Sequence, residues 1–281
     1  MRRRGAAIGQ DARTPLRVGA TKGEGRMRAD AVNRHALAYG AGAIGMGAVG
    51  LAFADFALQW QPVPPALAGN APLAVASALV LIAGGALVVV RRTAFWGAAL
   101  LAAWFGLWVV ALHLPRVLAA PTGALVGALL GPAEIGTMSA AGAQLALVSR
   151  GGAAGWLRAA PRIVFGLCAL IFGLSHFVYA DFTAAMVPGW IPGKLFWAWA
   201  TGAGHVAAGL ALVGGIRVRL AATLLAAMTG SFVLLVHAPR IVADPASQLE
   251  WTMGCAAWLI AGSAWVMRTA GGAGAMRTAG R

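Results

Sequence analysis

The chain has 281 residues, of which 60% are apolar and only 11% are charged, a balance outside that of soluble globular domains. A water-soluble core of this size could not cover so much apolar surface, so the composition indicates an integral membrane protein. The formal net charge of +14 comes from 22 Lys and Arg. In a chain this apolar, these residues belong in loops and tails, and we expect no nucleic-acid partner.

The N-terminal segment is polar and Arg-rich and contains no apolar run, so we expect no secretory signal peptide in it. We predict a basic, disordered cytoplasmic tail over residues 1–33, with Met27 as a candidate true start. A second disordered tail is predicted over residues 268–281, because Met267 and Met276 each begin the same low-complexity sequence, Met-Arg-Thr-Ala-Gly.

Eight apolar stretches lie between the tails, each close to the roughly 20 residues that a helix needs to cross a bilayer. They cover residues 36–56, 72–90, 95–114, 123–149, 161–180, 195–214, 218–238 and 250–267. The pair Gly131-Pro132 interrupts the fourth stretch, so we expect its membrane part to begin near Glu134.

The Lys and Arg residues are unequally divided between the two sides of these stretches. With the N-terminus in the cytoplasm, 19 of the 22 fall inside, and only Arg116, Lys194 and Arg240 fall outside. Because Lys and Arg gather on the cytoplasmic side of membrane proteins, we predict that both termini are cytoplasmic. Enrichment in Ala, Gly and Arg is typical of a GC-rich bacterial genome, so the predicted location is the bacterial inner membrane.

An internal repeat is visible in the sequence. The segment His113-Leu-Pro-Arg-Val-Leu-Ala-Ala-Pro121 matches His237-Ala-Pro-Arg-Ile-Val-Ala-Asp-Pro245 at five of nine positions. Upstream, Phe53-Ala-Asp-Phe56 matches Tyr179-Ala-Asp-Phe182. The order of these landmarks is the same in both halves, which indicates a duplication.

Four spans per half is an even number, so both halves enter the membrane from the same side. The predicted fold is therefore all-α: a polytopic membrane protein with eight transmembrane helices as two parallel four-helix repeats. We place the first repeat at 34–149, a cytoplasmic linker at 150–160 and the second repeat at 161–267.

Each half carries one Asp, one His, one Arg and one Glu at the outer ends of its spans. These are Asp55, His113, Arg116 and Glu134 in the first half, and Asp181, His237, Arg240 and Glu250 in the second. A compact bundle would bring them together at the outer mouth, where acids beside an Arg can pair.

Two interpretations of this polar cluster remain open. In the structural one, His-x-Pro-Arg stops a helix, Arg reaches the membrane interface and the acids cap neighbouring helices. In the functional one, an outward-facing pocket lets His and carboxylate exchange protons with a quinone-like or other small ligand while Arg steadies a negative oxygen.

His176 and His205 lie inside apolar stretches and have no counterpart in the first half. An intramembrane His is by default a candidate ligand-binding residue. Two of His176, His205 and His237 could ligate a haem, but a distinctive haem spacing is missing, and the competing interpretation is a hydrogen-bonded His in helix packing. Cys168 and Cys255 show no zinc spacing, so no metal site is predicted.

The second half, residues 161–267, resembles the DoxX-like membrane protein family of small four-helix proteins. The resemblance rests on Gly173-Leu-Ser-His-Phe177, Met186-Val-Pro-Gly-Trp-Ile-Pro192, Thr201-Gly202 and Arg217-Val-Arg-Leu-Ala221. Where many relatives carry a Glu shortly after the Thr-Gly pair, this chain has His205. Some members are similar to a membrane subunit of thiosulfate:quinone oxidoreductase, and others are linked to oxidative-stress membrane complexes.

The resemblance implies a membrane subunit of a redox complex, surrounded by the lipid bilayer and by other subunits; the cofactor is left open, with quinone as one candidate and haem as a weaker one. The rival hypothesis is a non-catalytic small-molecule permease or membrane scaffold that uses the groove between the halves. Quinone use predicts that Asp181, His237 and Arg240 face one lipid-accessible cavity, whereas transport predicts a continuous polar path to the cytoplasm. No nucleotide-binding or hydrolase motif occurs, and whether the chain is itself catalytic stays open.

Overall fold

The computed structural model describes residues 22–152 and 154–273, which form helices joined by short turns and contain no strand. Helical structure extends into both segments for which disorder was predicted. Helix α1 begins at Lys22, and η7 (Arg268–Ala273) follows the last long helix. Residues 1–21 and 274–281 of the predicted tails lie outside the described residues.

The long helices follow the eight predicted apolar stretches closely. They are α1 (Lys22–Phe53), α2 (Ala71–Val89), α3 (Ala94–Leu107), α5 (Leu125–Ser149), α6 (Ala160–Val178), α8 (Lys194–Gly214), α9 (Val218–Phe232) and α11 (Gln248–Met267). Shorter elements connect or extend them: η1 (Leu58–Trp60), η2 (Pro65–Leu67), η3 (Trp108–His113), α4 (Leu114–Ala119), η4 (Thr122–Ala124), η5 (Gly155–Arg158), α7 (Ala180–Met186), η6 (Val233–His237) and α10 (Ala238–Ala243).

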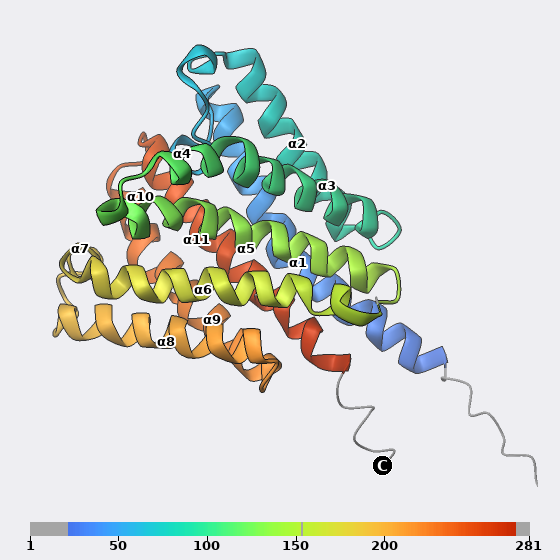
Figure 1. Ribbon diagram of the computed structural model, residues 1–281. Coiled ribbons are helices and arrows are strands. Elements are labelled where there is room, and N and C mark those ends of the chain that lie inside the picture. Colours follow the sequence, from blue (N-terminus) through green and yellow to red (C-terminus); the bar gives the residue numbers. More distant parts are fainter. Residues whose placement is uncertain (1–21, 153, 274–281) are drawn as a thin grey trace, which may run out of the picture.

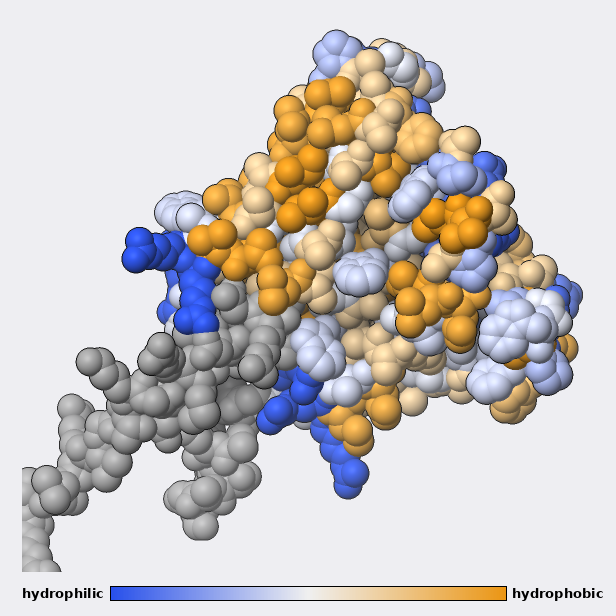
Figure 2. All heavy atoms as spheres, turned by 180° about the vertical axis from the view of Figure 1, so that it is seen from behind, coloured by the Kyte–Doolittle hydropathy of each residue, from blue (hydrophilic) through white to orange (hydrophobic). Residues whose placement is uncertain are grey.

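Among the described residues, seven helices are long and apolar enough to cross a membrane, which confirms seven of the eight predicted spans by length and composition. The eighth, α11, is 20 residues long, but Gln248, Glu250 and three Trp lower its hydropathy. Apolar side chains cover much of the molecular surface in Figure 2. Leu118 and Val242 are among the most exposed large apolar side chains, a pattern that suits lipid and not water.

The helices contact one another in the same order in both halves (Figure 1). Helix α1 packs on α2, α2 on α3 and α3 on α5, while α6 packs on α8, α8 on α9 and α9 on α11. Two further contacts join these sets, because α1 packs on α11 and α5 on α6. Helices α5 and α11 also contact each other, so the last long helices of the two sets lie side by side.

Glycine brings the first two helices of each half into backbone contact. A Cβ atom at Gly40 would lie 2.8 Å from the carbonyl oxygen of Gly85, and one at Gly166 would lie 2.9 Å from that of Gly209. The same contact recurs seven residues along each helix, between Gly47 and Ala78 and between Gly173 and Gly202. Small residues at such spacing let membrane helices approach closely.

The His-x-Pro-Arg motifs do not end their helices. In each half a π-helical turn, η3 or η6, leads through the motif into a further helical segment, α4 or α10. Proline lacks an amide hydrogen and clashes with the carbonyl four residues earlier, and the wider π turn relieves that clash. The interpretation that the motif stops a helix is therefore wrong. Helix α5 likewise runs through Pro132, so the pair Gly131-Pro132 does not interrupt the fourth helix.

Candidate functional site

The described carboxylates gather at one end of the bundle, and most of the described arginines at the other. Among residues 36–152 and 154–271, whose side chains the structure describes, every carboxylate lies toward the end that holds α4, α7 and α10, which we call the acidic end: Asp55, Glu134, Asp181, Asp244 and Glu250. The opposite end, the arginine end, carries Arg91, Arg92, Arg150, Arg158, Arg162, Arg217, Arg219 and Arg268.

The first-half polar group is built around Trp60. The Nε2 atom of buried His113 lies 3.0 Å from the carbonyl oxygen of Trp60. The ring of His113 fits against α5 because Gly131 has no side chain there, since a Cβ atom would lie 2.8 Å from the His113 ring. The indole of Trp60 faces Glu134, although its Nε1–H has no hydrogen-bond partner. Arg116 is exposed on α4.

The second-half polar group contains an ion pair. The Nε atom of Arg240 lies 3.5 Å from Oε1 of Glu250. The other carboxylate oxygen of Glu250 and the Nδ1 atom of His237 are both buried without a protein partner. Buried polar atoms without partners are rare in folded proteins, so this group has unused hydrogen-bonding capacity.

The two aspartates are placed differently, although their sequences match. Asp55 follows α1 in a loop, where its carboxylate accepts a hydrogen bond of 2.7 Å from the Phe56 amide. Asp181 is exposed in the first turn of α7. The structure therefore brings Arg240 and Glu250 together, but the polar groups of each half do not form one compact set.

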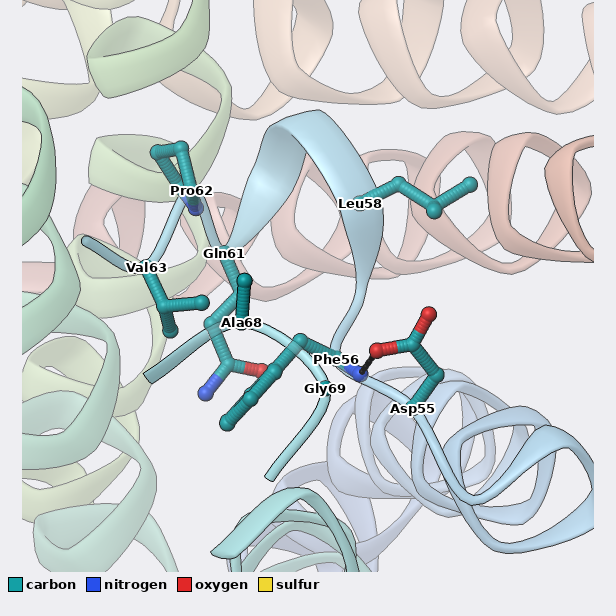
Figure 3. A pocket seen from close by; sticks show the side chains of 8 residues that line it. All are labelled: Asp55, Phe56, Leu58, Gln61, Pro62, Val63, Ala68 and Gly69. Carbon is teal, nitrogen blue, oxygen red and sulfur yellow. Dashed lines mark hydrogen bonds between the residues drawn. The ribbon is translucent and has the colours of Figure 1, made fainter. Parts of the chain in front are cut away.

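An open pocket of about 240 Å³ lies beside Asp55, in the loop between α1 and α2. In Figure 3 the Asp55 carboxylate stands on one side of it and the Gln61 amide on the other. The Gln61 amide donates to Ser77 Oγ at 2.8 Å, which ties this loop to α2. Since both polar groups already have hydrogen-bond partners, the pocket offers few free donors or acceptors to a ligand.

The strongest candidate site is a pair of histidines between α6 and α8. The rings of His176 and His205 have centroids 4.9 Å apart. The Nδ1 atom of His176 lies 2.8 Å from the Phe172 carbonyl oxygen, and that of His205 lies 2.9 Å from the Thr201 carbonyl oxygen. A carbonyl can only accept, so each Nδ1 carries the hydrogen, and each Nε2 of a neutral ring holds a free lone pair.

Aromatic rings enclose the pair on the protein side. His205 is only 2% exposed, with Phe172 edge-on at 5.6 Å and Phe232 at 6.4 Å between ring centroids. His176 is half-buried and forms the open side. Gly202 keeps the pair in place, because a Cβ atom there would lie 2.8 Å from the Cβ of His176.

The pair does not suit haem. Two axial imidazoles hold an iron and a porphyrin plane between them, and rings 4.9 Å apart leave no room for both. His237 forms the C-terminal end of a π-helical turn on another helix. Among the described residues, no group of three or more His, Cys, Asp or Glu side chains could hold a metal ion.

The sequence identified His176 and His205 singly but not as neighbours. The signal that would have paired them is the seven-residue glycine spacing: Gly166 and Gly173 on α6 contact Gly209 and Gly202 on α8. That contact sets how the two helices lie against each other and so which side chains meet.

These helices and their apolar surface are those of a multi-pass all-α membrane protein. No family model, curated protein or solved structure matches the chain.

Proposed function

We propose that this protein is a DoxX-like membrane subunit of a redox complex, and that it binds a quinol at His176 and His205. It spans the bacterial inner membrane eight times as two parallel four-helix repeats, with both termini in the cytoplasm. The observation that carries the function is the pairing of two imidazoles whose Nε2 atoms are left free as acceptors.

The repeat architecture is supported by equivalent contacts. The pairs Gly40–Gly85 and Gly166–Gly209 bring corresponding helices of each half together. Each His-x-Pro-Arg motif follows a π-helical turn. The first helix of each half contacts the last helix of the other half, because α1 packs on α11 and α6 packs on α5. A two-fold axis along the membrane normal relates these two contacts.

The chemistry of the pair favours the reduced form of a quinone. A quinol is a planar aromatic ring with two hydroxyl donors, and the two Nε2 atoms are acceptors. Phe172 flanks the buried imidazole, while His176 leaves one side open to lipid, where quinols dissolve. When a partner subunit takes two electrons from the quinol, its two hydroxyl protons pass to these imidazoles.

Equilibrium binding of a short-chain quinol to the purified full-length chain tests this proposal. His176→Phe and His205→Phe keep aromatic packing but remove the acceptors, and each is expected to weaken binding about tenfold, as loss of one buried hydrogen bond does. His237→Phe is the matched control, because it removes a buried His outside the pair. Equal binding by all four proteins, or no binding by folded wild type, would favour the permease or scaffold hypothesis.

A further inference from the structure

An apolar groove of about 320 Å³ lies between α8 and α9. Its walls are small or aliphatic side chains, chiefly Gly204, Ala207, Ala211, Leu220, Leu224 and Met228. Leu220 and Leu224 are exposed. The groove therefore opens on the lipid-facing surface of the second half and runs toward the arginine end, where Arg217 closes its lining.

The corresponding helices of the first half, α2 and α3, pack more closely than α8 and α9, and one residue accounts for the difference. Gly97 is the fourth residue of α3, and a Cβ atom there would lie 2.7 Å from the Gly84 carbonyl oxygen, so α3 lies directly on α2. Ala221 is the fourth residue of α9 and lines the groove. Its methyl group prevents an equally close approach of α9 to α8, which leaves the gap.

The mouth of the groove is positively charged. Arg217 is exposed at the N-cap of α9, and its backbone has a φ of 44°, a left-handed conformation that is costly for a residue with a side chain. The residue at the corresponding N-cap of α3 in the first half, Thr93, has an ordinary φ of −109°. Among residues 36–152 and 154–271, whose side chains the structure describes, no carboxylate lies at the arginine end beside Arg217.

We infer that this groove is a binding site for an anionic phospholipid, with one acyl chain between α8 and α9 and the phosphate on Arg217. A groove with apolar walls and a cationic mouth at a helix end matches a lipid with an apolar chain and a negative headgroup. The first amide groups of α9 point toward the same mouth and add to the attraction for phosphate. The site is independent of the histidine pair and of the quinol proposal.

Native mass spectrometry of the full chain, purified in detergent and titrated with phosphatidylglycerol, tests the site. Wild type should retain one lipid per chain in preference to phosphatidylcholine. Arg217→Asn keeps a residue that tolerates left-handed backbone but removes the charge, and is expected to weaken binding about fivefold. Arg219→Gln, a nearby Arg that does not line the groove, should bind as wild type does.

A second pair of variants tests the groove itself. Ala207→Phe fills the groove, whereas Ala83→Phe places the same side chain at the corresponding exposed position of α2. Lipid retention should be lost in the first variant and kept in the second, with both proteins folded by circular dichroism. The inference fails if Arg217→Asn and Arg219→Gln lose lipid equally, if Ala207→Phe retains it, or if a quinone co-purifies in the groove instead.

Discussion

His113 and His237 hold equivalent places in the two halves but differ in what their rings contact. His113 bonds the Trp60 carbonyl oxygen at 3.0 Å, whereas the Nδ1 atom of His237 is buried without a partner. A residue that looks duplicated in the sequence has therefore kept a structural role in one half, while the other half keeps unused hydrogen-bonding capacity.

Replacing each of these histidines with Phe should have unequal effects on stability. His113→Phe leaves the Trp60 carbonyl buried and unbonded, and we expect a loss of about 1–3 kcal/mol. His237→Phe removes a buried atom that already lacks a partner, and should change stability little or raise it. Thermal unfolding in detergent measures both, and equal losses would contradict the assignment of these two environments.

Gly202 is a residue whose replacement tests how the histidine pair is held in place. In Gly202→Ala, the new methyl group would press on His176 Cβ and on the Gly173 carbonyl oxygen, at 2.8 and 3.4 Å. We expect a loss of about 1–3 kcal/mol from overpacking, together with weaker quinol binding. Gly123→Ala is the control, because nothing lies within 4 Å of that position; both readouts should stay at wild-type values in it.

At the scale of helices, the contact between α2 and α3 depends on Gly97. A Cβ atom there meets backbone atoms of Val88 and Gly84, which cannot move aside as a flexible side chain would. Gly97→Ala should therefore cost about 3 kcal/mol, while Ala221→Gly at the corresponding position should cost about 1 kcal/mol through helix propensity alone. The melting temperatures of the two variants measure these losses. If Gly97→Ala melts at the wild-type temperature, α2 and α3 can move apart without cost.

The helix positions were predictable because an apolar run long enough to cross the bilayer has few alternatives to forming a transmembrane helix. The extents of two helices were not predictable. A proline usually ends a helix, but at Pro115 and Pro239 a π-helical turn carries the helix onward. The sequence identified His176 and His205 one at a time as candidate residues, but their meeting depends on backbone contacts between two helices. Composition and spacing within one helix do not specify those contacts.

For the whole molecule, the number of membrane crossings can be tested by reporters at three positions. We expect alkaline phosphatase to be active when fused after Trp190, beyond α7, and inactive when fused after Gly152 or at the C-terminus. Green fluorescent protein should show the opposite pattern, since it folds in the cytoplasm. Active phosphatase at the C-terminus would mean that α11 does not cross and that the chain has seven spans.

Helix α11 leaves the ribosome after α1, α5 and α9, yet it contacts all three. Gly262 on α11 lies against the backbone of Ala38 and Tyr39, and Trp258 donates a hydrogen bond of 3.0 Å to the Ala38 carbonyl oxygen. Until α11 has been made, this face of α1 stays uncovered in the membrane. The contacts of α1 are therefore completed only when α11 joins the bundle, and a stop codon before Gln248 should yield a chain that membrane proteases remove.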